Sequence, residues 1–351
     1  MSRFSGKSKA HPTFVIAGHL QRDYLLPLQG RPLLDVPGGN LLYAAAGLGV
    51  WEEIVPSEPR QTNIGLLARV GEEYPHDWLL SFEELGWDTS GVQILAEALD
   101  LRSFRAVVEG REIKTVNPVS HFARLGLPFP KSLLGYQPPP GTDNRRTTNP
   151  ASPRPKDIPE YYLSASIVHL CPMDYLTTSR LISTFRQASV TTLTLDPSAA
   201  YMTSTALDDV RILLQGLTAF MPSEEEIRAL FWGRTNDLWE MAEFLGKFGC
   251  ELIIIKRAAH GQMLYDSVSK KRWEIPAYPA RVAGFTGIGD SFCGGFLAGY
   301  QKTYDPVRSM LHGTVSASLT IEGCGVFHAL DALPGLAQAR LDSLVGIVRQ
   351  V

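Results

Sequence analysis

Short, largely apolar runs that alternate with segments of helical spacing constrain the fold of this chain more than any other feature. Runs of strand length occupy residues 13–18, 63–69, 167–170, 191–195 and 252–256, and helical spacing recurs between them. Strands that are apolar throughout are typical of sheets covered on both faces. We therefore predict an α/β fold with a central, mostly parallel sheet and helices on both faces.

The C-terminal third continues with helical spacing. Helices are expected at residues 291–300, 310–322 and 341–351. Earlier in the chain, residues 94–116 are expected to form strands that turn at Glu109-Gly110-Arg111, because Gly favours a tight hairpin turn.

Residues 128–159 fit neither a helix nor a strand. They contain nine prolines and several basic residues, among them Arg145, Arg146, Arg154 and Lys156. Proline fixes φ and removes a backbone donor, and a structureless loop of this length inside a compact domain is uncommon. We interpret the segment as an insertion. A passive surface loop is the favoured explanation, and an active-site cover whose basic residues face phosphates is the alternative.

Composition excludes several classes of function. The chain has 351 residues, of which 44% are hydrophobic. Its net charge is −3 and its basic residues are scattered, so we expect it to bind neither nucleic acid nor a membrane surface. The four cysteines form no C-x-x-C pair, so a zinc site is not expected. Residues 1–11 are polar and the apolar runs are too short to span a bilayer, so we expect a cytoplasmic protein without a secretory signal.

The richest stretch for chemistry is AGFTGIGDSFCGGF, residues 283–296. Gly287 and Gly289 allow backbone N–H groups to converge at the start of a helix, where anions are favoured. Asp290 follows in the first turn, close to where a transferred phosphate would rest, and could accept the proton of an attacking hydroxyl. A capped helix start with glycines for close packing explains the same letters equally well.

This stretch resembles the C-terminal signature of the ribokinase-like (PfkB-type) carbohydrate kinases, Asp-Thr-x-Gly-Ala-Gly-Asp followed by a small residue and Phe. The matching residues are Thr286, Gly287, Gly289, Asp290 and Phe292. Ile288 stands where the family has Ala. Gly284 and Phe285 replace the leading Asp and Thr.

Two N-terminal features are similar to the same family. Asp23, just beyond the first strand, corresponds to a substrate-binding Asp, whose carboxylate can accept hydrogen bonds from two sugar hydroxyls. Gly38 and Gly39 correspond to a Gly pair that lets the backbone approach a ligand, and Asn40 can donate and accept at once. The resemblance implies that all four bind substrate. An exposed loop acid and a tight turn before a buried helix are the simpler explanations.

Later motifs follow in the family's order. Ser198 and Ser223 stand where Asn is usual, and Glu226 keeps the acidic position. The resemblance implies that Glu226 organises waters around Mg²⁺, although Ser223 and Glu226 also fit a capping box. Lys256 and Gly261 resemble a strand end and turn beside the nucleotide, or they form a plain hairpin. With Thr286, we expect Ser223, Glu226, Lys256 and Gly261 to bind the cofactor.

The resemblance implies one ribokinase-like domain over residues 1–351, with a small β lid from residues 24–36 and 94–119. The expected reaction uses ATP and Mg²⁺ to phosphorylate a hydroxymethyl group of a sugar or sugar acid. Asp290 would be the general base, and N–H groups of Gly287, Ile288 and Gly289 would hold the phosphoryl group. The partner is then a small molecule, and a homodimer is possible.

Two alternatives remain. A nucleoside kinase of the same fold would show the same motifs. A catalytically inactive ligand-binding relative is the second, because Gly284, Ser198 and Ser223 depart from the family pattern while Gly289 and Asp290 are retained.

Overall fold

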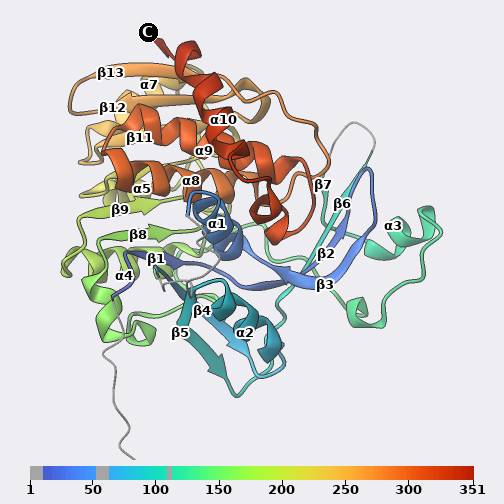
Figure 1. The fold of residues 1–351 in the computed structure, drawn as a ribbon. Helices are drawn as coiled ribbons and strands as arrows, with labels where there is room; N and C mark the ends of the chain where they lie inside the picture. Colours follow the sequence, from blue (N-terminus) through green and yellow to red (C-terminus); the bar gives the residue numbers. More distant parts are fainter. Residues whose placement is uncertain (1–10, 53–62, 109–112) are drawn as a thin grey trace, which may run out of the picture.

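A ten-stranded sheet forms the centre of the molecule (Figure 1). The computed structural model describes residues 11–52, 63–108 and 113–351. The strand order is β14-β13-β12-β11-β10-β9-β8-β1-β4-β5, with neighbours parallel from β5 to β11 and antiparallel beyond. The strands are β1 (Phe14–Ala17), β4 (Ile64–Gly71), β5 (Trp87–Leu95), β8 (Ile167–Leu170), β9 (Thr192–Leu195), β10 (Ala219–Phe220), β11 (Leu252–Lys256), β12 (Gln262–Asp266), β13 (Lys271–Ile275) and β14 (Arg349–Gln350).

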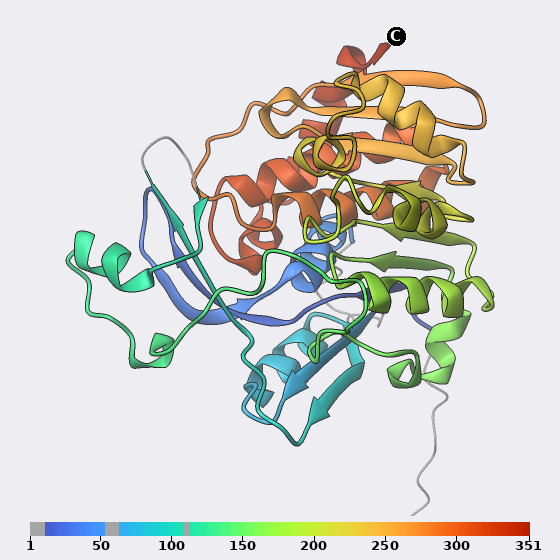
Figure 2. The same cartoon turned by 180° about the vertical axis from the view of Figure 1, so that it is seen from behind.

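Helices cover both faces of this sheet, as the alternating sequence pattern predicts (Figures 1 and 2). On β1, Phe14 and Ile16 join one hydrophobic core, and Val15 and Ala17 join the other. The first core includes α1 (Asn40–Gly49), α2 (His76–Glu84), α8 (Ile288–Thr303), α9 (Pro306–Ile321) and α10 (Leu336–Leu344). The second includes α4 (Tyr175–Arg186), α5 (Leu207–Leu214), α6 (Glu224–Leu230) and α7 (Leu238–Gly246).

A second, four-stranded sheet projects from the side of the molecule, and we call it the lid sheet (Figure 1). Its strands lie in the order β3-β2-β6-β7 and are β2 (Gln21–Leu26), β3 (Leu33–Gly38), β6 (Arg102–Val107) and β7 (Ile113–Lys114). These strands fall within or beside the two segments expected to form a lid. Residues 94–95 instead belong to β5 of the large sheet, and the turn expected at Glu109–Arg111 lies outside the described residues.

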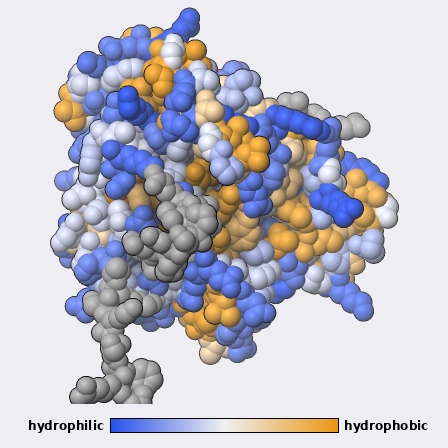
Figure 3. All heavy atoms as spheres, viewed as in Figure 1, coloured by the Kyte–Doolittle hydropathy of each residue, from blue (hydrophilic) through white to orange (hydrophobic). Residues whose placement is uncertain are grey.

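One face of the lid sheet has its own small core. Tyr24 and Phe104 from β2 and β6 pack with Phe122 of α3 (Pro118–Arg124) and with Leu133 and Tyr136 beyond it. Further apolar side chains of the lid region remain exposed, and hydrophobic residues are visible over it on the right of Figure 3. The first part of the Pro-rich segment is therefore packed onto the lid sheet.

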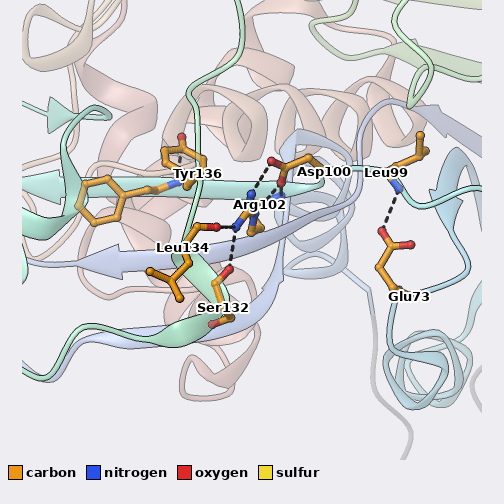
Figure 4. A network of polar contacts seen from close by, with 8 residues as sticks. Glu73, Leu99, Asp100, Arg102, Ser132, Leu134 and Tyr136 are labelled. Carbon is orange, nitrogen blue, oxygen red and sulfur yellow. Dashed lines mark hydrogen bonds and ion pairs between the residues drawn. The ribbon is translucent and has the colours of Figure 1, made fainter.

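An Arg102 network fixes that packing (Figure 4). Arg102 on β6 donates to the carbonyl oxygens of Ser132 and Leu134 at 2.8 and 2.9 Å. Asp100 holds the same guanidinium through two hydrogen bonds of 2.7 Å. The guanidinium also lies 5.9 Å from the centroid of the Tyr136 ring.

From Tyr136 the chain crosses to the large sheet, where we call residues 139–150 the arch (Figure 2). Beyond the arch, Asp157 forms a bidentate ion pair with Arg69 of β4, with N···O distances of 2.6 and 3.0 Å. Both side chains are almost fully buried, and Asp157 also accepts the backbone N–H of Arg154. The segment thus has firm attachments on both the lid sheet and the large sheet.

The expected helix at residues 341–351 is wrong in its second half. The helix α10 ends at Leu344, a 3₁₀ turn follows at Val345–Ile347, and β14 pairs antiparallel with β13. Without β14, β13 would be the open edge of the sheet, and pairing satisfies backbone groups that a helix would leave uncovered. Sequence analysis also missed β13 and the helix α5. Among the described residues, every helix is too short or too polar to span a bilayer.

The Arg69–Asp157 pair leads to a stability prediction. Asp157→Ala should lower the free energy of unfolding by about 3 kcal/mol, because it leaves a buried guanidinium unpaired and removes the attachment of the segment to β4. Lys156→Ala, one residue away and not in the pair, is the matched control. Equal denaturation midpoints for the two variants in urea would contradict the prediction.

Candidate active site

A cleft of about 860 Å³ opens between the lid sheet and the carboxyl ends of the parallel strands. This edge is where open α/β sheets bind ligands. The lining includes six of the residues that the sequence assigned to catalysis or binding: Asp23, Gly39, Asn40, Thr286, Gly287 and Asp290. Residues far apart in the chain are therefore brought to one site.

The amino end of α8 forms one end of the cleft. Gly287 precedes the helix with φ +74°, and a Cβ there would lie 2.0 Å from the Tyr43 ring. The first N–H groups of a helix have no partner within the helix and attract anions. Farther along, a Cβ on Gly294 would lie 1.9 Å from the carbonyl oxygen of Ala44 in α1, so that glycine serves helix packing. Close packing thus explains both Gly287 and Gly294, and anion binding at the helix start stays a prediction.

Asp290 lies in the first turn of α8 and lines the cleft. Burial raises the pKa of its carboxyl to about 6, while Lys256 and Arg105 lower it and Glu226 raises it further. A base with a pKa near neutrality suits proton transfer, because it is ionised at pH 7 yet can still hold a proton.

Lys256, at the end of β11, lies beneath that helix start rather than in the cleft lining. Its Nζ donates to Asp196 Oδ2 at 2.5 Å and lies 3.9 Å from Cys293 Sγ. A Cβ on Gly289 would be 3.4 Å from the same Nζ. Burial opposes the charge of Lys256, but Asp196, Cys293 and Glu226 together raise its pKa.

Ser223 and Glu226 form the capping box that the sequence allowed. Glu226 Oε2 accepts the N–H of Ser223 at 2.7 Å, and Ser223 Oγ accepts the N–H of Glu226 at 3.2 Å. Burial and Asp196 raise the pKa of Glu226 to about 6. Ser223 forms a parallel bridge with Lys256, so this helix start is adjacent to the cluster beneath α8. None of the three lines the cleft itself.

The donor set bears on how Mg²⁺ could be held. No three His, Cys, Asp or Glu side chains within the described residues are grouped to enclose a metal ion. Mg²⁺ characteristically keeps several waters and uses one or two carboxylates together with phosphates. Glu226, acting through water, fits that mode of binding.

Gly261 has a backbone role. It has φ +77°, and a Cβ would lie 2.0 Å from the carbonyl oxygen of Ile275. It joins a 3₁₀ turn to β12 and is outside the cleft lining, although the resemblance implied cofactor binding.

Asp23 projects from β2 into the cleft and is 1% exposed. Neither carboxylate oxygen has a hydrogen-bond partner among the described residues. Burial raises the pKa of Asp23 to about 6, and Arg105 and Ser103 offset only part of that rise. A Cβ on Gly38 would lie 2.1 Å from this carboxyl group, which explains the glycine there. A buried carboxylate without partners is suited to receive hydroxyl groups from a ligand.

Asn40 lines the cleft, but its amide also holds the backbone. Oδ1 accepts the N–H of His19 at 2.8 Å, and Nδ2 donates to the carbonyl oxygen of Pro172 at 2.7 Å. These contacts join the loops that follow β1 and β8. Gly39, with φ +104°, has no room for a side chain because a Cβ would lie 2.2 Å from the carbonyl oxygen of His19.

The departure at Gly284 has a steric reason. A Cβ there would lie 2.6 Å from the carbonyl oxygen of Gly323 and 3.0 Å from Cys324 Sγ. Ser198, the second departure, lines the cleft, and its hydroxyl caps the N–H of Ala200 at 3.3 Å.

Sequence reasoning missed Arg105 and the contribution of the arch. Arg105 lies on β6, where Phe104 and Ala106 face the lid core and Arg105 faces the cleft. The alternation of Phe104, Arg105 and Ala106 was the available signal. The basic residues that the alternative explanation placed toward phosphates do not line the cleft: Arg145 pairs with Asp209, and Arg154 donates to Thr177.

Comparison with known proteins identifies similar chains. Residues 153–332 match the pfkB family carbohydrate kinases. A cytidine kinase from Thermococcus kodakarensis is 26% identical over 291 residues, covering 82% of this chain and 88% of that protein.

Solved structures show the same fold. A nucleoside kinase from Burkholderia thailandensis in complex with inosine has a TM-score of 0.66 at 16% identity, covering 95% of this chain and 99% of that one. A putative ribokinase II from E. coli in complex with ATP and Mg²⁺ has a TM-score of 0.65 at 15% identity, covering 95% and 100%.

The burial of the Asp23 carboxylate is expected to lower the free energy of unfolding of the protein. Its folded pKa lies above the unfolded value, so its ionisation opposes folding once the pH rises past 4, and fully above 6. Asp23→Asn should therefore raise the free energy of unfolding at pH 7 by on the order of 2 kcal/mol, because two pKa units correspond to that scale.

This gain should shrink at pH 4, where the folded carboxyl is already neutral. Asp35→Asn, on the neighbouring strand and paired with Arg22, is the control. Urea unfolding at pH 4 and pH 7 measures the effect. An equal change in the free energy of unfolding at both pH values would contradict the prediction that ionisation of Asp23 opposes folding.

Proposed function

The chain belongs to the pfkB family of carbohydrate kinases, and we propose that it transfers the γ-phosphoryl group of ATP to the hydroxymethyl group of a nucleoside. Its class of reaction is ATP-dependent phosphotransfer. The observation that carries the finer proposal is the placement of two acids, the buried Asp23 and the half-buried Asp290, in one cleft. One can hold substrate hydroxyls, and the other can take the proton of the reacting hydroxyl.

Asp290 is the proposed general base. It follows the open N–H groups of Gly287, Ile288 and Gly289, where a transferred phosphoryl group would rest. Its carboxylate is ionised at pH 7 because the pKa is about 6. The proton therefore leaves the acceptor hydroxyl beside the anion-binding helix start.

The charges of the cleft favour a neutral acceptor. Four acids, Asp23, Asp143, Asp174 and Asp290, line it against one arginine, Arg105, among the described residues. A sugar acid would bring a further negative charge into this environment, so the charges of the cleft disfavour a sugar acid as the acceptor. Asp23 can instead accept hydrogen bonds from two uncharged ring hydroxyls.

A nucleoside is favoured over a free sugar for two reasons. The cleft, at about 860 Å³, has room well beyond one sugar ring near Asp23 and Asp290. The cytidine kinase match extends over most of both chains. The sequence alone predicts a sugar or sugar acid as the acceptor, with a nucleoside as an alternative. The family's motifs do not distinguish these acceptors.

Glu226 is the residue proposed to hold Mg²⁺ through water. When bound with ATP, Mg²⁺ would neutralise phosphate charge during transfer. Lys256 balances the acids around that position, and its ion pair with Asp196 keeps it beneath α8.

Asp290→Asn tests the base. It should lower kcat with cytidine or inosine by roughly 10²–10⁴-fold while ATP still binds, because the amide cannot accept the proton. The wild-type kcat/KM should fall below pH 6 as Asp290 becomes protonated. Cys324→Ser, nearby but outside the cleft lining, serves as the control.

Phosphate transfer to cytidine, inosine and ribose is measured by product mass. Near-wild-type turnover in Asp290→Asn would contradict the assignment of the base. Phosphorylation of ribose without either nucleoside would contradict the proposed acceptor.

A further inference from the structure

The arch supplies a large part of the cleft wall. Nine of the 24 residues that line the cleft belong to it. They are Pro139, Pro140, Thr142, Asp143, Asn144, Thr147, Thr148, Asn149 and Pro150. A passive surface loop would not contribute the lining of a substrate-sized cavity, so the explanation that the sequence favoured does not account for this placement.

One end of the arch is fixed by Asp143. Its Oδ2 accepts the N–H of Tyr175 at 2.6 Å, and its own N–H donates to the carbonyl oxygen of Ala200 at 2.9 Å. The next residue but one, Arg145, pairs with Asp209 of α5 at 2.6 Å. These contacts attach the arch to the loops that follow β8 and β9.

The other end is fixed at the start of α4. The N–H of Asn149 donates to Asp174 Oδ2 at 3.1 Å, and Asp174 also caps α4. Just beyond the arch, Ser152 Oγ and His19 Nε2 are 2.8 Å apart. Burial lowers the pKa of His19 to about 4, so this contact is made by a neutral ring. The arch is therefore a preorganised wall.

The groups of the arch that remain available to a ligand are uncharged. The Asp143 carboxylate is occupied by backbone N–H groups, and the arch's two arginines do not line the cleft. By contrast, Thr142 and Thr148 line the cleft, and their hydroxyls make no hydrogen bond within the described part of the chain. Prolines beside them offer apolar surface.

We propose that the arch is a specificity-determining wall that binds the nucleobase of the substrate, with Thr142 and Thr148 supplying hydrogen bonds. The reacting hydroxyl must meet Asp290, and Asp23 is suited to the ring hydroxyls. Beyond these two acids, the arch contributes the longest stretch of the lining and can meet the rest of the molecule. This inference rests on the proposed nucleoside kinase activity.

Thr148→Val and Thr142→Val test the arch without changing side-chain size. Each should raise the KM for cytidine or inosine roughly 3- to 10-fold, the effect of losing one hydrogen bond. The KM for ribose, which lacks a base, the KM for ATP and kcat should stay within about twofold. Arg146→Gln, exposed on the same arch and absent from the lining, is the matched control.

Nucleoside affinity is also measured by calorimetry without ATP in the Asp290→Asn background, where no phosphate transfer can occur. If wild type phosphorylates nucleosides and both threonine variants bind them as tightly as Arg146→Gln does, the arch inference alone is overturned. If wild type accepts ribose and neither nucleoside, the proposed function fails first, and the inference about the base fails with it. Weaker nucleoside binding with unchanged ribose kinetics supports the inference.

Discussion

The ion pair between Lys256 and Asp196 is the interaction on which the site depends. It lies beneath the start of α8, with Asp290 and Glu226 close enough to affect the same charges. Three carboxyl groups lie around one ammonium and only Asp196 is paired with it, so negative charge is in excess. Removing water from such a cluster raises the pKa values of the acids toward neutrality. The strand β11 thus contributes to the chemistry through charge, although its lysine does not line the cleft.

The cleft owes its shape to backbone groups that approach too closely for side chains. Gly38 leaves space for the Asp23 carboxyl group, and Gly287 lies against the Tyr43 ring. A side chain at Gly38 would meet the Asp23 carboxyl group directly. A side chain at Gly287 would meet the Tyr43 ring at the start of the helix that carries Asp290.

Sequence reasoning predicted the features that depend on short-range patterns. The apolar runs predicted the large sheet, and the Gly-Asp turn predicted a helix start in the cleft at Asp290. Lys256 and Gly261 were expected at the cofactor, yet the first lies beneath α8 and the second has a steric reason in the backbone. Arg105 was not singled out, because its position depends on how β6 pairs with β2 across many residues.

The arch shows the limit of such reasoning most clearly. Proline content predicted correctly that residues 128–159 would avoid long helices and sheets. It could not predict where the segment would lie, because that depends on contacts with Tyr175, Ala200 and Asp209, which are remote in sequence. The end of the chain failed for a related reason: β14 exists only because β13 is there to pair with it.

The attachments of the Pro-rich segment make it a short covalent connection between the lid sheet and the rest of the molecule. Tyr136 is packed in the lid core, and Asp143 is hydrogen-bonded to Tyr175 at the start of α4, so only residues 137–142 connect the two attachments. Three of these six residues are prolines, and a proline-rich chain extends by about 3.1 Å per residue. The lid sheet therefore has a maximum distance from the large sheet that is set by chain length, on the order of 20 Å between the two attachment points. The length of this connection therefore limits how far the lid sheet can lie from the cleft.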